Sequence, residues 1–527
     1  MKIVSKDLFS ATRPGFKMRG SDLFYCRLAD ELAQTALKSM NTDEDLDLEP
    51  YEAMLIGMSL SGYVEDLATD LGIWSALLQH HAACYGPDYQ VPFFPEVPED
   101  TELESEPSIY AVSYLLWGLL RILRPGLIVP PHSPFHIIIP ADDCMRVIDR
   151  YWMQAPSNDY LADFLLDENR SYQSLKDRLL WLHTNSYLFG PRHHSQMLHR
   201  AEQQMAGRPQ DQMSELMELD RDAHDTPSIW SAVTALQLLP HIIDADEADT
   251  QMLLNWAPLR TSLYQSEGWE DASHTRLRFR PVLGLPPCIV QFEPDDPAPS
   301  PHMTAPGTYC LGSLVPWKQG WHFSGPFQAF SERDIPDAAN KLHQLALEMQ
   351  QGAFALMPDL LEHTRGIIRG QEPLAMELTG GRGWMLTQEP MDLTRLSAAQ
   401  PDEHAEPVIC PAHALLFFIP DAGWAFFIEG KRLLEILDKR GQHITEAERA
   451  LFFRFLQSSD HLDVILGMLE RAGHSMETVG YVLSCDIKCP EDLQALIRAY
   501  SPESFLPRHP MVKLSGSTVE QVLSGRS

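Results

Sequence analysis

The spacing of the apolar residues changes near residue 260 of this chain of 527 residues. Up to about residue 260 they recur with a period near 3.6, which is typical of amphipathic helices. Around Tyr264 polar and apolar residues begin to alternate, which is the period of a strand, and residues 338–353 restore the period of 3.6. A segment with one period cannot bury its apolar residues in the other structure. The change therefore predicts an α+β protein with a helical N-terminal half and a mixed C-terminal half with antiparallel β-hairpins and terminal helices.

Helices are predicted where the period of 3.6 follows a capping residue or a proline. Ser21 and Asp22 precede one such segment, and Pro107 opens another. The helices predicted in the first half span residues 22–36, 51–67, 71–84, 108–123, 142–152, 171–187, 192–205 and 229–243. Those predicted in the second half span residues 338–353, 432–437, 446–456, 461–472 and 490–500.

The alternating segments predict two hairpins and one further strand. Residues 275–280 read as a strand, and strands 309–317 and 321–327 flank a three-residue loop that ends at Gly320. Strands 415–419 and 424–428 form the second hairpin. We expect three units: a helical domain at 1–260, a mixed segment with a Trp-rich hairpin at 261–400, and a hairpin with helices at 401–527, packed with the second unit.

Composition and charge limit the partners and the location. The chain has 41 Lys and Arg against 73 Asp and Glu, a formal net charge of −32, which opposes strong binding to duplex DNA. Its longest apolar run, 114–123, is shorter than a membrane-spanning helix, so no membrane partner is expected. There is no secretory signal at residues 1–7, and eight scattered cysteines favour buried thiols in a reducing compartment. We expect a cytoplasmic protein.

The common catalytic signatures are missing from the sequence. It contains no HExxH, GxSxG, Walker A, GxGxxG or paired CxxC motif, so no catalytic residue and no cofactor are predicted. The glycine-rich stretch 379–383 lacks the Lys-Ser/Thr pair of a phosphate loop, and we interpret it as a turn.

Two patterns resemble metal sites but are incomplete. His80 and Cys84 are spaced i,i+4 on a predicted helix, and Cys485 and Cys489 form a CxxxC, yet no segment provides three ligands at a recognised spacing. We expect no bound metal. Asp421, with Glu429 and Lys431, imitates the PD…ExK pattern of metal-dependent nucleases. The two carboxylates would lie roughly 20 Å apart along a hairpin, too far to share one cation.

An aromatic group surrounds the first hairpin loop. Trp317, Trp321 and Phe323 are candidates either for a sheet core or for a protein-interaction surface. Around a three-residue loop, Trp317 and Trp321 would share one face of the hairpin, which favours the core.

Short blocks in this order along the chain share a pattern with one known family. They are residues 6–9 (KDLF), 21–25 (SDLFY), 62–66 (GYVED), 72–74 (GIW), 114–117 (YLLW), 314–325 (LVPWKQGWHFSG) and 415–420 (LLFFIP). The chain thereby resembles an uncharacterised bacterial family known only as a domain of unknown function and common in gut anaerobes. The resemblance implies no reaction, cofactor or catalytic residue, and its pattern does not include Cys84, Asp421 or Cys489.

Two classes of function remain open. The first is a non-catalytic protein-binding component of a bacterial multiprotein system, favoured by the missing catalytic signatures. The second is an enzyme with a dispersed active site in the cleft between the halves, acting on an anionic substrate. Its candidate anion-binding residues are His274, Arg276, Arg278, Arg280, Arg365 and Arg369. A pocket with converging polar side chains would favour the enzyme, and a flat apolar patch the protein-binding component.

Overall fold

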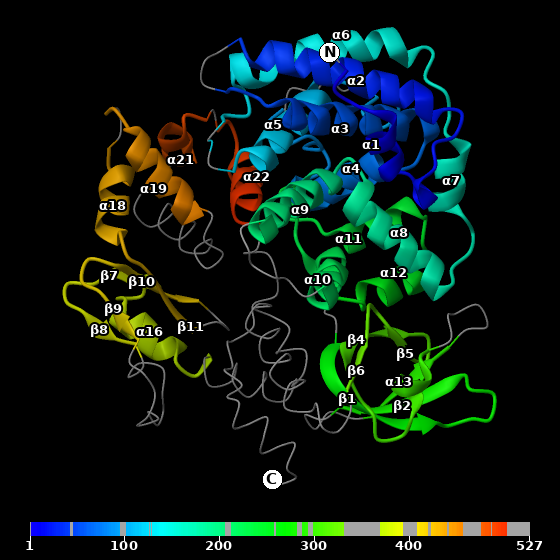
Figure 1. Cartoon of the computed structure of the whole chain (residues 1–527). Helices are drawn as coiled ribbons and strands as arrows, with labels where there is room; N and C mark the ends of the chain where they lie inside the picture. Colours follow the sequence, from blue (N-terminus) through cyan, green and yellow to red (C-terminus); the bar gives the residue numbers. More distant parts are fainter. Residues whose placement is uncertain are drawn as a thin grey trace.

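A computed structural model gives the structure of the protein. It describes residues 2–42, 46–94, 102–125, 127, 129–205, 212–257, 260–281, 287–292, 299–330, 369–393, 408–419, 423–439, 442–456, 476–485 and 487–502. Helices occupy the first half of the chain and strands begin at Arg260, so the predicted α+β class is confirmed (Figure 1).

The helices of the first half gather in the upper part of Figure 1. They are α1 (Lys6–Ala11), α2 (Asp22–Met40), α3 (Pro50–Thr69), α4 (Ile73–Tyr85), α5 (Ile109–Leu123), α6 (Ile139–Trp152), α7 (Asp159–Leu166), α8 (Tyr172–Asn185), α9 (Gly190–Met205), α10 (Gln212–Asp225), α11 (Ala235–Ile242) and α12 (Glu247–Leu254). Helix α5 is buried on every side from Ala111 to Arg121, because its sequence is apolar all round. Helices α2 and α3 touch at Gly57, where a Cβ would lie 2.3 Å from the Ala29 carbonyl oxygen.

One predicted helix is too long at its N-terminal end. The period of 3.6 predicted a helix over 229–243, but Ser231 and Ala232 have φ values of 55° and 61°, which no right-handed helix contains. Helix α11 instead starts after Thr234, whose side chain accepts a hydrogen bond from the Gln237 backbone in a capping box. Helices α1, α7, α10 and α12 were not predicted, since three of them are shorter than nine residues.

The first sheet closes into a barrel, which lies below α10 and α12 in Figure 1. Its strands are β1 (Arg260–Trp269), β2 (Arg276–Pro281), β3 (Cys288–Gln291), β4 (Tyr309–Trp317), β5 (Gly320–Phe323) and β6 (Gln328–Phe330). The order β1-β2-β3-β5-β4 returns to β1, β3 and β5 are parallel, and β6 extends beside β4. A short helix, α13 (Pro301–Thr304), connects β3 to β4. This closed five-stranded order is that of an OB-fold barrel.

Alternating residues of the barrel strands fill its interior, as the period of 2 predicted. Strand β2 alternates exposed and buried positions, and its buried Leu277 and Phe279 join Tyr264, Val290 and Leu314 in one cluster. A bulge between Ser266 and Gly268 bends β1, which lets this one strand pair with both β2 and β4. The barrel therefore has a core of its own, separate from the helical core.

The Trp-rich hairpin differs from the prediction by one residue. Trp317 pairs with Gly320 and Pro316 pairs with Trp321, so the turn contains two residues rather than three. Residues paired across two strands share a face, and neighbours along a strand do not. The prediction that Trp317 and Trp321 share a face is therefore wrong: Trp317 joins the helical core, whereas Trp321 packs against the barrel core.

The rest of the described chain forms two small sheets and five helices. The strands are β7 (Trp384–Leu386), β10 (Leu415–Ile419) and β11 (Gly423–Phe427) in one sheet, and β8 (Met391–Asp392) and β9 (Ile409–Cys410) in the other. The helices are α16 (Glu372–Leu378), α18 (Gly430–Leu437), α19 (Glu446–Leu456), α21 (Met476–Leu483) and α22 (Pro490–Tyr500). The second predicted hairpin is confirmed as β10 and β11. The predicted helices 338–353 and 461–472 lie outside the described residues.

The last helix packs against the N-terminal helices. Arg121 of α5 donates a hydrogen bond to the Ala499 carbonyl at 3.0 Å, and its guanidinium lies 4.0 Å from the centre of the Tyr500 ring. Tyr89 donates a hydrogen bond to the Asp492 carboxylate near the start of α22. The domain boundaries at 260 and 400 stay a prediction, but α22 clearly shares the core of the first half.

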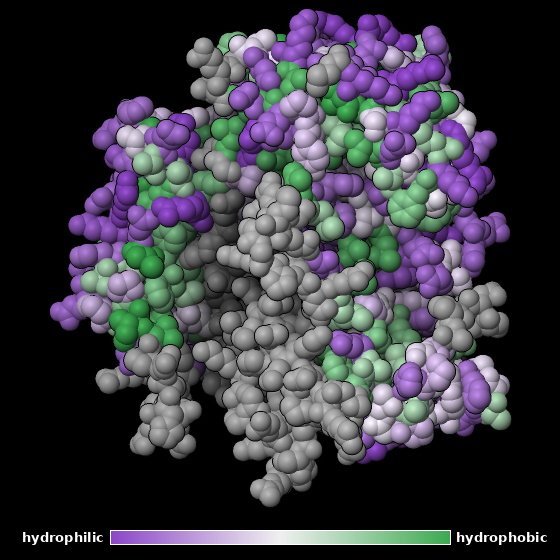
Figure 2. Space-filling model, in the orientation of Figure 1, coloured by the Kyte–Doolittle hydropathy of each residue, from purple (hydrophilic) through white to green (hydrophobic). Residues whose placement is uncertain are grey.

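Side chains on the molecular surface are mainly hydrophilic over the N-terminal helices at the top of Figure 2. None of the described helices is both long and apolar enough to cross a membrane. None of the eight cysteines, all of which lie in the described part of the chain, forms a disulfide, and six of them are buried.

Candidate functional site

Among the pockets of the described residues, one of about 590 Å³ along α2 and α6 and one of about 440 Å³ beside α5, α9 and α22 have a more polar lining. Two other cavities are the candidates for a functional site, and their volumes differ. The helical cavity, lined by residues of α1, α3, α8 and α9, measures about 60 Å³. The junction pocket, between α8, α10 and the barrel, measures about 490 Å³. Small-molecule sites usually have volumes of roughly 300–1,000 Å³. The junction pocket therefore has room for a small organic molecule, and the helical cavity does not.

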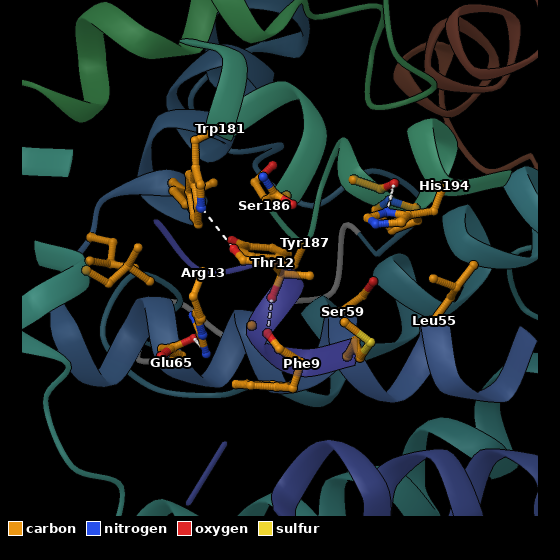
Figure 3. Close-up of a pocket in the computed structure, with 18 residues that line it drawn as sticks. Phe9, Thr12, Arg13, Leu55, Ser59, Glu65, Trp181, Ser186, Tyr187 and His194 are labelled. Carbon is orange, nitrogen blue, oxygen red and sulfur yellow. Dashed lines mark hydrogen bonds and ion pairs between the residues drawn. The ribbon is translucent and has the colours of Figure 1, made fainter. Parts of the chain in front are cut away.

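The helical cavity contains a buried ion cluster (Figure 3). Arg13 pairs with Glu65 at 2.7 Å and with Asp22 at 3.0 Å, and all three side chains are almost fully buried. The Asn158 amide donates hydrogen bonds to both carboxylates. Figure 3 also shows Trp181 bonded to the Thr12 carbonyl beside this cluster. Because these charges already have partners, the cluster serves to join α1, α2 and α3.

Asp66 lies on α3 next to this cluster and caps the following helix. Its carboxylate accepts hydrogen bonds from the backbone of Ile73 and Trp74 and from the Tyr187 hydroxyl. Burial nevertheless raises the pKa of Asp66 from 3.8 to about 6, because desolvation outweighs these hydrogen bonds.

We expect Asp66 to make the protein less stable as the pH rises from about 4 to about 6.5. A carboxyl with a raised pKa in the folded state contributes stability below its unfolded pKa, and that stability is lost through the folded pKa. Unfolding in urea at several pH values should show a loss of about 1–3 kcal/mol from this residue over that window. The slope should be shallower in Asp66→Asn, and an unchanged slope would contradict the assignment.

The junction pocket has apolar walls and one polar end. Its lining residues are Tyr172, Gln173, Lys176, Leu180, Leu216, Leu219, Asp220, Phe292, Pro299, Ser300, Met303, His322, Phe323, Ser324, Gly325, Pro326 and Phe327. Lys176, Asp220 and Ser324 lie together at the polar end, and His224 lies behind them. We call these four residues the junction cluster.

The junction cluster is linked by hydrogen bonds across three segments. The Lys176 ammonium forms an ion pair with Asp220, and its Nζ lies 2.5 Å from Nε2 of His224 and 3.2 Å from Oγ of Ser324. The same Oγ lies 3.2 Å from Nε2 of His224. Each of the four residues is at most 5% exposed. Such a connected group of a lysine, a carboxylate, an imidazole and a hydroxyl is able to move a proton away from the hydroxyl.

Local structure explains how these four side chains meet. Asp220 and His224 are spaced i,i+4 on α10 and therefore share one helix face. Ser324 follows β5, and its backbone N–H bonds to the Ser313 carbonyl of β4 at 2.9 Å. The next residue, Gly325, lies against Asp220, because a Cβ there would be 2.7 Å from the carboxylate oxygen. The helices and the barrel can approach this closely only with glycine at that position.

Aromatic rings hold the barrel against the helices beside the cluster. Tyr172 of α8 stacks on His322 with ring centres 3.8 Å apart, and its edge meets Trp317 at 5.6 Å. Trp256 lies 6.0 Å from Trp317 and 5.9 Å from His224. Trp317 is only 1% exposed, so this contact is a rigid support for the pocket.

Burial controls the charges of the cluster. It lowers the pKa of Lys176, while the neighbouring Asp220 acts in the opposite direction. Burial and, secondly, the Lys176 charge hold the pKa of His224 well below its usual value. His224 is therefore a neutral imidazole at physiological pH. Burial and Asp220 act in opposite directions on the charge of Lys176.

The candidate anion-binding residues lie elsewhere on the barrel. Arg276, Arg278 and Arg280 share the outer face of β2, where Glu267 and Glu270 pair with them. The structure thus brings three predicted arginines together, but none of them lines the junction pocket.

The other candidate anion-binding residues are dispersed. His274 lies in the turn between β1 and β2, with its ring 5.1 Å from that of Trp269. Arg369 is exposed just before α16, and Arg365 lies outside the described residues. Of the aromatic candidates, Phe323 lines the junction pocket, Trp317 supports it and Trp321 packs in the barrel.

The residues of the patterns that resemble metal or nuclease sites are only partly described by the structure. His80 and Cys84 approach each other, with 3.5 Å between Nε2 and Sγ. In the part of the chain that the structure describes, no group of three or more His, Cys, Asp or Glu is arranged to hold a metal. Asp421 lies outside the described residues, and Glu429 pairs with Arg432 and Arg454. The stretch 379–383 is a turn, as interpreted.

No pattern in the sequence pointed to the junction cluster. Lys176 is an isolated lysine, and helix α10, which carries Asp220 and His224, was not predicted. The i,i+4 spacing of Asp220 and His224 was the one available signal, and it is common on ordinary helices. Ser324 lies inside the block 314–325, in which the aromatic residues form the more evident pattern.

Comparison with known proteins assigns this chain to a family without assigning it an activity. Residues 2–273, just over half of the chain, match one family model. This region includes Lys176, Asp220 and His224, whereas Ser324 and the blocks 314–325 and 415–420 lie outside it. No curated protein and no solved structure matches the chain. The chain therefore belongs to the family described as Protein of unknown function (DUF3843).

Proposed function

We propose that this protein binds a small organic molecule in the junction pocket, as the substrate-binding step of an enzyme. The observation that carries the proposal is the pocket itself: about 490 Å³, mostly apolar walls and a polar group at one end. Ligand sites typically combine a largely apolar lining with a few convergent polar groups.

The lining indicates the chemistry of the molecule. Tyr172, Phe292, Phe323 and Phe327 provide ring faces and edges for an apolar or aromatic body. At the polar end, Asp220 already balances the charge of Lys176. The ligand end that reaches this cluster therefore carries an uncharged polar group, such as an ester, amide or hydroxyl, rather than a full negative charge.

This proposal keeps the location that the enzyme hypothesis expected, the cleft between the two halves. It replaces the expected anionic substrate with an uncharged one. The expected cleft between the halves corresponds to the junction pocket, while the arginines of β2 are paired with glutamates outside it. The protein-binding hypothesis stays a prediction.

We also infer a cytoplasmic location and no strong binding to duplex DNA. The eight cysteines, none of which forms a disulfide, support a reducing compartment. The net charge of −32 supports weak affinity for phosphate backbones.

Narrowing the pocket tests the proposed function. Leu216 of α10 lines the pocket and is 45% exposed, so tryptophan at this position should obstruct ligand entry with little loss of stability. The matched control is Leu198→Trp, since Leu198 is 44% exposed on α9 and does not line the pocket. Saturation-transfer NMR against a library of small neutral esters, amides and alcohols should find ligands that wild type and Leu198→Trp bind.

The expected result is that Leu216→Trp lowers the affinity for these ligands at least tenfold, which corresponds to about 1.4 kcal/mol of binding free energy. If both variants bind the ligands as wild type does, the site lies elsewhere. If wild type binds no compound of this class, the proposed ligand chemistry is wrong.

A further inference from the structure

We propose that Ser324 is a catalytic nucleophile and that Lys176 accepts its proton, so that the protein transfers the acyl group of a small neutral ester or amide. This inference rests on the proposed function, since the acyl compound would be the molecule bound in the junction pocket. Nothing in the sequence motifs or in the family description assigns such a role.

The position of the hydroxyl supports this role. Ser324 lines the pocket at its polar end, and its Oγ is within 3.2 Å of two nitrogen atoms, Nζ of Lys176 and Nε2 of His224. A nucleophilic serine needs a base within hydrogen-bond reach and a third group that orients this base. Asp220 supplies the third group, because its carboxylate holds Nζ of Lys176.

Charge balance selects Lys176 rather than His224 as the base. When neutral Lys176 takes the proton, the ammonium that forms is paired with the Asp220 carboxylate, and the negative charge passes to the carbonyl oxygen of the substrate, so the total charge of the site does not change. When His224 takes it, an imidazolium would form 2.5 Å from Lys176, without a carboxylate of its own at similar distance. Lys176 acts as the base only after its ammonium, which is paired with Asp220, has lost a proton; burial favours this loss by lowering the pKa of Lys176, and Asp220 opposes it.

The reaction balances without a cofactor. The Ser324 oxygen forms a bond to the carbonyl carbon, its proton moves to Nζ of Lys176, and the bond from that carbon to the leaving oxygen or nitrogen breaks. Lys176 returns the proton to the leaving group, so an alcohol or amine departs and an ester to Ser324 remains. Water then cleaves this ester by the same proton path, and a carboxylic acid is released.

A fluorophosphonate with a short alkyl chain tests the nucleophile in the full-length protein. Attack by Ser324 forms an oxygen–phosphorus bond and releases fluoride, and the serine proton goes to Lys176. Intact-mass and peptide mass spectrometry should find one label per chain, on Ser324. Ser324→Ala should lose this label.

Two further variants separate the chemistry from folding. Ser313→Ala is the matched control, because the Ser313 hydroxyl bonds to Thr261 and contacts no base, although its carbonyl accepts the Ser324 backbone N–H. It should label as wild type does. Lys176→Arg keeps the positive charge beside Asp220 but removes the base, and should slow labelling about 100-fold. The wild-type labelling rate should rise with pH as Lys176 loses its proton.

The outcomes distinguish the two proposals. The assignment of Ser324 as the nucleophile is overturned if Ser324→Ala is still labelled at the same peptide. The role of Lys176 as its base is overturned if Lys176→Arg is labelled at the wild-type rate. Failure of wild type to label while neutral esters still bind in the NMR experiment also overturns the assignment of Ser324, and leaves the proposed function intact. Labelling on Ser324 while Leu216→Trp binds and reacts as wild type does would support the nucleophile and contradict the proposed entry route.

Discussion

Replacing Trp317 with alanine is expected to lower the free energy of unfolding by about 3–5 kcal/mol, the range for a large aromatic side chain removed from a packed core. Trp317 is 1% exposed and contacts Tyr172 and Trp256 at the junction between barrel and helices. Both the lost burial and the cavity left behind contribute to the cost. At about 2–4 °C per kcal/mol, the melting temperature should fall by roughly 6–20 °C.

Trp321→Ala is the matched control on the same hairpin. Trp321 is only half-buried and lies on the opposite face, against the barrel core. Its removal should cost clearly less, because less area returns to water. Denaturant unfolding of both variants, followed by circular dichroism, measures the difference. A larger cost for Trp321→Ala than for Trp317→Ala would contradict the assignment of Trp317 to the junction.

Replacing Arg13 with alanine is expected to cost about 3–5 kcal/mol, the usual effect of removing one partner from a buried ion pair. Asp22 and Glu65 would keep their burial but lose their cation, and the Asn158 amide cannot neutralise two carboxylates. Urea unfolding at pH 7 should show this loss. The cost should become smaller at lower pH, because burial raises the pKa of Glu65 and protonation of this carboxyl removes one unpaired charge.

The control for Arg13 is an arginine with two carboxylate partners at the surface. Arg146 pairs with Asp142 and Asp143, but its side chain is 69% exposed. Solvent screens such pairs, so Arg146→Ala should cost at most about 1 kcal/mol. Equal losses in the two variants would show that burial of the Arg13 cluster does not determine its contribution.

The helical half was largely predictable because a helix depends on the spacing of apolar residues and on capping residues that are close in the sequence. The segments around α3, α5 and α8 follow a period of 3.6 between clear ends, and the helices lie within a few residues of the prediction. The prediction over 229–243 was wrong at its start because Ser231 and Ala232 adopt positive φ values, which serine and alanine rarely do. Three of the helices that the pattern missed are too short to show a period.

In the Trp-rich hairpin, an error of one residue in the predicted loop length changes which side chains share a face. A loop of three residues instead of two reverses the face of every residue on the returning strand. The predicted strand limits at 309–317 agree with β4, yet Trp321 lies on the opposite face from Trp317. Strand identity depends on local alternation, but register depends on the turn.

The sequence by itself determined the α+β class, most helices and both hairpins, because periodicity and turn residues are properties of neighbouring positions. Only the tertiary structure decided that β1 pairs with β4 to close a barrel and that this barrel packs against α8 and α10. It also decided the candidate site. Lys176 and Ser324 are separated by 148 positions, and no residue near either one indicates the other. Their meeting follows from the packing of Trp317 and Gly325 against the helices, which is a property of the whole fold.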